Sequence, residues 1–393
     1  MLAKGPAADI LPKIVRDHGI SEVHWNRHYE PWMVERDTKI KAALRADTIT
    51  VHSHKGNVLV EPWEPRTGAG QPYRVFTPYY KNILAAGIDA AQAPDLPKTV
   101  HSVAPKHTLS VDDFKLLPHK PRWDTKMEAY WDISETGAHE RLAEFLKLPA
   151  QGYKDARDIP SQDATSRLSP YLHFGHISPV QVYNACTKSG HNHADFVREI
   201  MWREFSMHLL YHNPDLPSQP LQAAFKRMPW LQNEAQLKAW QSGQTGYPIV
   251  DAGMRQLWET GWMHNRVRMI VASFLVKHLL LPWQDGEAWF WDCLVDADLA
   301  NNSASWQWVS GCGADAAPYF RVFNPILQGE KFDPKGLYVR KWCPELAAVP
   351  DKFLHKPWES GLKLAYPAPI IDHSEGRNRA LAAYQTLKTP VKT

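Results

Sequence analysis

WMHNRVRM (residues 262–269) and DADLANNSASWQW (residues 296–308) open and close the segment that decides the fold of this chain. Ten of the seventeen tryptophans of the chain fall between positions 202 and 308. Packing alone seldom requires so many, because each buried indole also needs a hydrogen-bond partner for its N–H group. The segment therefore predicts that a large flat ligand lies among the tryptophans.

Length and composition narrow the possible classes of protein. A chain of 393 residues with 44% apolar residues allows two or three soluble domains. The net charge is only +3, so a nucleic-acid partner would need the basic residues gathered on one face. We expect no signal peptide and no membrane span, because the chain lacks both an apolar leader and a long apolar run. The four cysteines show no metal spacing, which favours buried thiols in a cytoplasmic protein.

Two kinds of structure are expected along the chain. Helical and strand patterns alternate in residues 1–57, which indicates a parallel sheet with helices on its faces. The expected helices are 8–18 and 32–45, and the expected strands are 21–26 and 48–52. A proline-rich connector then runs over the surface from 58 to 125, with a possible helix at 79–84.

Residues 126–393 are expected to form a mostly α-helical domain. Ser169-Pro170 and Ser178-Pro179 each place a capping hydroxyl before a proline suited to the first helical turn. The fold class is therefore a helical domain preceded by a short α/β domain. The expected helices are 179–188, 194–212, 233–242, 247–260, 262–281, 286–296, 303–310 and 376–388.

Two of these helices carry polar stripes that could line a pocket. On 194–212 the stripe opposite the apolar side combines aromatic, acidic and basic groups. On 262–281 one stripe combines an aromatic ring, an amide, a guanidinium and a thioether. Such a surface suits a planar, partly polar ligand, but a salt bridge or a helix–helix contact would produce the same pattern. The stripes consist of Glu199, Trp202, Arg203 and Ser206 on the first helix, and of Trp262, Asn265, Arg266 and Met269 on the second.

The segment from Asp163 to Pro170 is a candidate phosphate site. It combines the hydroxyls of Thr165, Ser166 and Ser169 with the guanidinium of Arg167 at the start of a helix, where backbone N–H groups are free. No Rossmann or Walker glycine pattern occurs in the chain, so those two kinds of phosphate loop are disfavoured.

Several ordered motifs together resemble the flavin-binding domain of the DNA photolyase and cryptochrome family. The resemblance extends into the first third of the chain through Asn26 to Trp32 and Tyr73 to Pro78, and it is nearest to the bacterial class I-type photolyases. The motifs are TSRLSPYLHFG (165–175), WREF (202–205), TGYPIVD (245–251), GWMHNR (261–266) and DLANNSASWQW (298–308).

The resemblance implies that FAD binds non-covalently in the helical domain. Arg268 would pair with Asp296 beside the isoalloxazine, Asp298 would accept a hydrogen bond from the ring edge, and Asn302 would face flavin N5 and tune its redox state. The residues implied for the pyrophosphate and ribityl region are Tyr153, Thr165, Ser166, Arg167, Leu168 and Ser169.

The resemblance also implies light-driven repair of ultraviolet-damaged DNA. Enzymes that act on (6-4) photoproducts carry two histidines where this chain has Asn265 and Met269, and cryptochromes usually replace the asparagine at N5. The chain therefore resembles a photolyase for cyclobutane pyrimidine dimers, with a cryptochrome-like light receptor as the alternative. The implied dimer pocket, into which the damaged bases flip, consists of Glu199, Trp202, Asn265, Met269 and Trp308. Glu199, kept protonated by burial, would donate a hydrogen bond to a base carbonyl.

Two further sets of residues are implied by the family. Trp306, Trp283 and Trp240 would pass electrons from the protein surface to oxidised flavin. Four arginines would contact DNA phosphates and make binding depend on salt: Arg157, Arg203, Arg266 and Arg321. Arg266 could equally form an internal ion pair. We expect the protein to act as a monomer.

The front of the chain departs from the family pattern. Family members normally begin with a five-stranded antenna domain, of which residues 1–57 would supply only the last two strands and their helices. The shortened sheet predicts an exposed edge and an unpaired apolar face in residues 1–60. The sequence gives little support to a second, light-harvesting chromophore of the folate or deazaflavin type, because much of its usual cleft would be missing.

Overall fold

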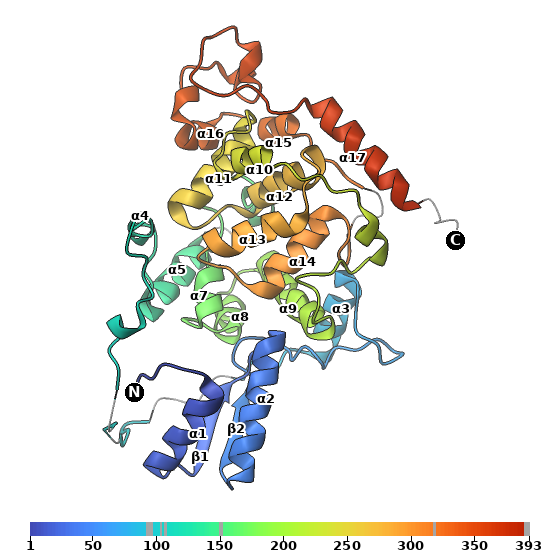
Figure 1. Ribbon diagram of the computed structural model, residues 1–393. Coiled ribbons are helices and arrows are strands. Elements are labelled where there is room, and N and C mark those ends of the chain that lie inside the picture. Colours follow the sequence, from blue (N-terminus) through green and yellow to red (C-terminus); the bar gives the residue numbers. More distant parts are fainter. Residues whose placement is uncertain (92–96, 103, 106–107, 149–151, 317–319, 389–393) are drawn as a thin grey trace.

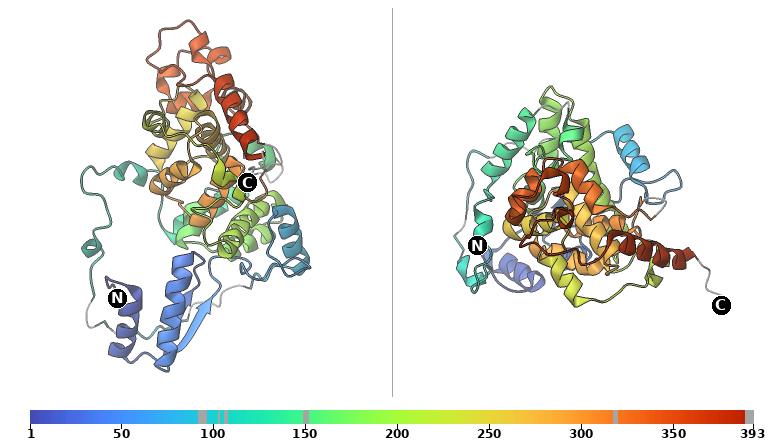
Figure 2. Two further views of the ribbon diagram at one scale, coloured as in Figure 1. Left: turned by 45° about the vertical axis from the view of Figure 1, so that its right-hand side comes forward. Right: turned by 90° about the horizontal axis from the view of Figure 1, so that it is seen from above.

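A computed structural model describes residues 1–393 except 92–96, 103, 106–107, 149–151, 317–319 and 389–393. An α/β segment lies at one end of the molecule, and α15 and α16 lie at the opposite end of a larger helical body (Figures 1 and 2). The helical body holds most of the apolar core, so the fold class expected from the sequence is confirmed in outline. No helix among the described residues is long and apolar enough to cross a lipid bilayer.

The α/β segment contains a two-stranded parallel sheet, as the alternation of elements predicts. Strand β1 (Glu22–Asn26) pairs with β2 (Thr50–His54). Helix α1 (Ala7–His18) precedes β1, and helix α2 (Pro31–Ala46) connects the two strands. The second strand begins two residues later than expected. Thr48 has a φ of 62°, in the left-handed region, so the chain is still turning there and cannot yet pair as a strand.

The two faces of this sheet differ in chemistry. Val51 is buried, and Val23 and Trp25 pack with it against α1 and α2, around Val15, Ile40 and Leu44. The side chains that alternate with these point to the other face and are exposed: Glu22, His24, Asn26, Thr50, His52 and His54. The expectation of an unpaired apolar face in residues 1–60 was wrong, because the open face is polar.

The connector does not simply cross the surface. Val58 and Leu59 are buried, and helix α3 (Phe76–Ala86) starts three residues before the predicted helix and buries Phe76 and Tyr79 in the helical body. A short 3-10 turn follows at Asp112–Phe114. The connector positions 92–96, 103 and 106–107 lie outside the described residues.

The helical body begins at residue 125. Helices α8 and α9 have the predicted bounds; Ser178 caps the first of them by accepting a hydrogen bond from the backbone N–H of Gln181. The helices are α4 (Thr125–Glu128), α5 (Glu135–Lys147), α6 (Tyr153–Ala156), α7 (Ser169–Phe174), α8 (Pro179–Lys188), α9 (Ala194–His212), α10 (Glu234–Gln241), α11 (Pro248–Thr260), α12 (Asn265–Ser273), α13 (Trp283–Cys293), α14 (Leu299–Ser310), α15 (Pro325–Phe332), α16 (Leu337–Trp342) and α17 (His373–Lys388).

Three helices of the tryptophan-rich segment differ from their predicted bounds. The helix expected at 286–296 is α13, which starts at Trp283, directly after Pro282, and ends at Cys293. The helix expected at 262–281 starts at Asn265, because His264 caps it, and it gives way to a π-helical turn at Phe274–His278. Helix α14 starts four residues earlier than expected, because the Asp298 carboxylate accepts a hydrogen bond from the N–H of Asn301 and caps the helix. Asn302 therefore lies in the first turn of a helix and not before it.

The apolar interior forms two large clusters. One surrounds Trp240, Phe274 and Trp283 in helices α10 to α14, and the other surrounds Tyr79 and Phe205 in α3 and α5 to α9. The four cysteines are buried and unpaired, as expected from their spacing. Side chains from α7, α9, α12 and α14 face one another across a cavity. The cavity therefore lies between the helices of the two apolar clusters.

Candidate flavin and substrate cavity

A cavity of about 350 Å³ opens in the middle of the helical body, within the size range of ligand sites. All ten residues expected to hold the cofactor line it, although they come from four separate parts of the chain. They are Tyr153, Thr165, Ser166, Arg167, Leu168, Ser169, Arg268, Asp296, Asp298 and Asn302.

The loop before α7 forms one end of the cavity. Arg167 has a φ of 51°, so the backbone turns sharply at the point where its side chain lies over the Trp262 ring, 5.1 Å from the centroid. Burial lowers the pKa of Arg167, and its Nε is buried without a hydrogen-bond acceptor, although Asp163 Oδ1 lies 3.3 Å away. A guanidinium at the cavity wall whose Nε lacks a hydrogen-bond acceptor fits an anionic group such as a pyrophosphate.

Arg141 holds this loop in place and was not expected from the sequence. Its Nε donates to the carbonyl of Ser166 at 2.9 Å, and its Nη2 donates to the carbonyl of Thr165 at 2.6 Å. The same guanidinium pairs with Asp163 at 2.9 Å. The backbone of the candidate phosphate loop is therefore fixed before any ligand binds.

Arg268, Asp296 and Ser169 form a network at the middle of the cavity. Arg268 Nη2 donates to both oxygens of Asp296, at 2.9 and 3.1 Å, and Arg268 Nε donates to the carbonyl of Met263 at 2.7 Å. The hydroxyl of Ser169 donates to Asp296 Oδ2 at 2.5 Å. The Asp296 side chain is only 3% exposed, so its negative charge is neutralised within this network.

Asp298 and Asn302 lie one turn apart at the start of α14. Burial alone would raise the pKa of Asp298, but hydrogen bonds from His173 and from the backbone of Asn301 outweigh it, so the pKa lies below its usual value. Asn302 Nδ2 donates to the carbonyl of Glu287 at 2.9 Å, which fixes the orientation of the amide. Asp298 thus remains an ionised acceptor at the cavity wall.

Glu287 is a second residue that the sequence did not single out. Its side chain is buried, the hydroxyl of Ser303 donates to it, and burial raises its pKa to about 7. Its backbone carbonyl also holds Asn302. The sequence signal for Glu287 was its position on a tryptophan-rich helix, four residues after Trp283. That signal was not sufficient to predict its role, because its partners lie on another helix.

The expected DNA-facing residues divide into two groups. Six line the cavity: Arg157, Glu199, Trp202, Arg203, Asn265 and Met269. Three do not line it. Arg266 pairs with Asp158 at 2.6 Å. This is the internal ion pair that was the alternative to a contact with a DNA phosphate. Arg321 is exposed and lies over the Phe323 ring, and half-buried Trp308 donates to the carbonyl of Asp315 at 3.2 Å.

The environment of Glu199 is not that of the buried hydrogen-bond donor that was expected. Its side chain is 30% exposed, and both of its oxygens accept hydrogen bonds from the Arg157 guanidinium, one of them at 2.8 Å. Such a bidentate pair stabilises an ionised carboxylate, which accepts hydrogen bonds and donates none. Arg157 is also committed to this pair and is not a free phosphate ligand.

Arg203 and Trp202 have structural partners that the sequence did not reveal. Arg203 donates to the carbonyl of Asn57 at 2.7 Å and its side chain is 11% exposed, so it joins the connector to α9 and does not reach out to DNA. The Trp202 ring stacks on Phe76 with 3.7 Å between centroids and 8° between planes. One face of this indole is therefore occupied.

The three tryptophans expected to reach the surface are all buried. Trp306 and Trp240 lie edge to face with 6.2 Å between centroids, but Trp240, Trp283 and Trp306 are each at most 2% exposed. The expectation of a path to the surface through these three alone was wrong. Half-buried Trp230 packs against the same core. The next residue, Leu231, donates its backbone N–H to the carbonyl of Leu280 at 2.8 Å, so Trp230 lies near the segment that precedes Trp283.

Comparisons with known protein families match both parts of the chain. Residues 1–98 match the family described as DNA photolyase. Residues 196–386, which include most of the cavity wall, match the FAD binding domain of DNA photolyase.

Curated proteins and solved structures match nearly the whole chain. A deoxyribodipyrimidine photo-lyase from Agrobacterium fabrum is 48% identical over 99% of this chain and 84% of its own length. A crystal structure described as a bacterial class III photolyase from Agrobacterium tumefaciens superposes with a TM-score of 0.93 at 47% identity, covering 99% of this chain and 84% of that one. Cryptochrome-1 of Arabidopsis thaliana is 34% identical over 94% of this chain and 57% of its own length. The expected class I-type subgroup has no support here, because the structural relative is a class III photolyase.

Proposed function

Because the chain belongs to the DNA photolyase and cryptochrome family, we propose that it is a deoxyribodipyrimidine photo-lyase that splits cyclobutane pyrimidine dimers in ultraviolet-damaged DNA. The observation that carries the proposal is the single cavity in which the candidate flavin residues and Asn265 and Met269 face the same space. The relative at 48% identity carries the name of this activity over nearly the whole chain. The proposed active form is a monomer.

FAD fits the residues of the cavity. Arg167 with the Thr165 and Ser166 hydroxyls would hold the pyrophosphate, and Arg268 with Asp296 would lie beside the isoalloxazine. Asn302 would face flavin N5, since its amide is already held by the carbonyl of Glu287. When bound and reduced, FAD supplies the electron that light transfers to the dimer, and it receives that electron back after the two C–C bonds break.

The residues at the mouth of the cavity would bind and orient the flipped dimer. Asn265 Nδ2 is the neutral donor available for a pyrimidine carbonyl, because both oxygens of Glu199 already accept hydrogen bonds from Arg157. Met269 and the free face of Trp202 would pack on the pyrimidine rings, where base stacking contributes about 1–3 kcal/mol per base. The Arg157–Glu199 pair places fixed charges beside the developing charge of the reduced dimer.

We place the protein with the class III photolyases within the family. The support is the 47% identity to a class III photolyase over 99% of this chain, together with the close superposition. The structural match includes the α/β segment, since nearly the whole chain is covered.

The activity can be tested with purified, chemically reduced protein and dimer-containing single-stranded DNA. On illumination the absorbance of the bases near the ultraviolet maximum should return, and it should not return in darkness or with undamaged DNA. Protein that holds FAD and restores no absorbance would rule out the repair function and favour a cryptochrome-like receptor. Protein that binds no FAD would contradict both.

Replacement of Glu199 with alanine should slow repair by about tenfold, which corresponds to about 1.4 kcal/mol of lost stabilisation. Without its carboxylate partner, the Arg157 guanidinium is no longer held in one orientation at the mouth of the cavity, while the loop from Thr165 to Ser169 is untouched. The measurement is the repair rate per photon absorbed, with FAD content read from flavin absorbance. Glu140→Ala, which removes an exposed carboxylate on α5, is the matched control. Loss of FAD from the Glu199 variant would assign that residue to cofactor binding.

A further inference from the structure

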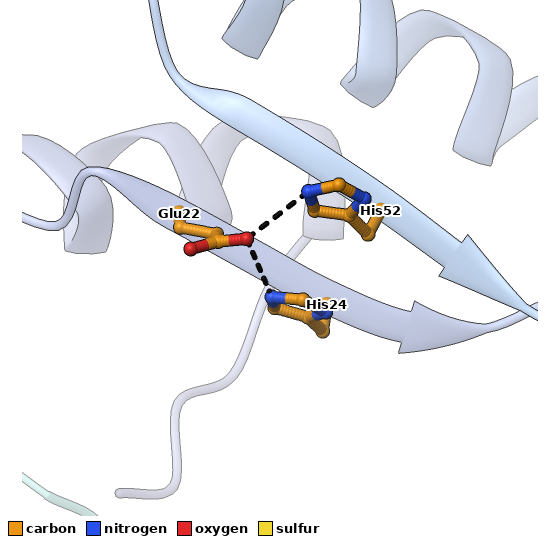
Figure 3. A group of neighbouring side chains, drawn as sticks. All are labelled: Glu22, His24 and His52. Carbon is orange, nitrogen blue, oxygen red and sulfur yellow. Dashed lines mark ion pairs between the residues drawn. The ribbon is translucent and has the colours of Figure 1, made fainter.

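The open face of the two-stranded sheet carries a group of potential metal ligands. These residues precede every residue of the cavity wall in the sequence. Glu22, His24 and His52 project from this face, and their side chains meet between the two strands (Figure 3). Glu22 Oε1 lies 3.0 Å from Nε2 of His24 and 3.0 Å from Nε2 of His52. All three potential ligand atoms lie within 4.8 Å of one another.

The backbone fixes this arrangement. His24 of β1 and His52 of β2 are direct partners in the parallel register, so their rings stack with 4.8 Å between centroids. Glu22 precedes His24 by two residues and therefore points to the same face. Ligands on paired strands keep their spacing better than ligands on a loop, because the strand hydrogen bonds hold their Cα atoms.

We propose that Glu22, His24 and His52 bind one divalent transition-metal ion of the zinc type. Two imidazole nitrogens and one carboxylate oxygen form a ligand set used by zinc sites that leave the fourth position to water. Tetrahedral coordination at zinc distances places ligand atoms about 3.3 Å apart. The two O···N distances of 3.0 Å are within a few tenths of an ångström of that spacing, so small side-chain rotations suffice.

His54 supplies a second, independent indication of a ligand site. Its Nε2 lies 2.9 Å from His24 Nδ1, and the two rings are parallel to within 4°. A neutral His24 that binds metal through Nε2 must carry its proton on Nδ1, and His54 is placed to accept that proton in a hydrogen bond. Such an outer partner fixes the tautomer and the orientation of a metal-binding imidazole.

The site is accessible to an ion from solvent. The side chains of Glu22, His24 and His52 are each about half exposed, and the apolar core of this segment lies on the other side of the sheet. A bound ion would link β1 to β2 and stabilise a sheet that has two strands within the described residues. This role is separate from the flavin cavity and does not depend on the proposed repair function.

The test is zinc binding by the full chain with FAD bound, after treatment with a chelator. Zinc chloride is titrated in competition with a chromophoric chelator, and cobalt chloride is used in parallel to read the visible spectrum of a tetrahedral site. We expect one tight site in the wild-type protein. We expect its loss in His24→Ala, His52→Ala and Glu22→Ala, and affinity about 10–100-fold weaker in His54→Ala.

Two controls keep the result interpretable. His18→Ala removes a histidine of the same segment that is absent from the cluster, so it should bind zinc like the wild type. Unchanged flavin absorbance in every variant shows that the helical body remains folded. Zinc should also raise the thermal unfolding midpoint of wild type and of His18→Ala, and should leave that of His52→Ala unchanged.

Three outcomes would overturn the proposal. The first is the absence of a tight site in the wild-type protein. The second is equal zinc affinity in wild type, His24→Ala and His52→Ala, which would mean an adventitious ion only. The third is a tight site that survives all three ligand substitutions but disappears when another histidine pair is replaced, such as His278 with His373.

Discussion

Replacement of Asp296 with alanine is expected to weaken FAD binding by about 100-fold, through the loss of one partner of a buried, hydrogen-bonded ion pair. Asp296 accepts two hydrogen bonds from Arg268 and one from Ser169. Without it, the guanidinium in the cavity wall has no counter-charge and the Ser169 hydroxyl has no acceptor. Both groups would turn away from the position that the flavin needs.

The measurement is the FAD content of the purified protein and the dissociation constant from flavin fluorescence. Asp296→Asn keeps the shape and one acceptor oxygen, so its affinity should lie between that of the alanine variant and that of the wild type. Asp292→Ala, which removes an exposed carboxylate at the end of α13, four residues before Asp296, should bind FAD normally. Full FAD content in Asp296→Ala would show that the Arg268–Asp296 pair does not support the flavin.

Replacement of Trp306 with phenylalanine is expected to reduce the photoreduction of oxidised FAD to background. Trp306 lines the cavity and lies edge to face with Trp240, so it is the indole placed to give an electron to the excited flavin. A phenyl ring is far harder to oxidise than an indole. Repair by chemically reduced protein should continue at the wild-type rate, because that reaction does not use the tryptophan.

The measurement is the loss of oxidised-flavin absorbance under blue light with an external reductant. Trp291→Phe, which changes an exposed tryptophan on α13, should photoreduce normally. Gly286 matters for the interpretation, because an added Cβ there would lie 2.1 Å from the Trp306 ring. The indole therefore packs directly on the α13 backbone, and a smaller ring leaves a void. The void should lower the thermal unfolding midpoint of Trp306→Phe, so unchanged flavin absorbance must accompany the loss of photoreduction. Normal photoreduction in this variant would contradict the assignment.

Local signals predicted the helices well where caps and periodicity agree. The bounds of α8 follow from Ser178 and Pro179, which cap and start the helix within a few residues. Prediction failed where a helix end depends on three-dimensional geometry that the amino-acid sequence does not reveal. The π-helical turn at Phe274–His278 shortens α12, and the carboxylate of Asp298 starts α14 four residues early. Likewise, the shortened sheet was expected to leave an apolar face unpaired, but the apolar side chains of β1 and β2 are the ones that pack against α1 and α2.

The candidate cofactor residues could be chosen from the sequence because they sit in ordered motifs. Their partners could not, because the contacts join distant parts of the chain. Ser169 and Asp296 are 127 positions apart, and Arg203 and Asn57 are 146 apart. The same limitation explains why Glu199 was expected to be protonated. Its partner Arg157 lies on another segment, so periodicity on α9 could not indicate the ion pair.

The attachment of residues 57–60 to α9 has a consequence for how the protein would respond to a cut in its backbone. Buried Glu204 accepts hydrogen bonds from the N–H groups of Leu59 and Val60, and Arg203 holds Asn57. These bonds and the buried side chains of Val58 and Phe76 do not depend on an unbroken connector. A protease that cleaves after exposed Lys98 would therefore yield two fragments that migrate together until a denaturant separates them.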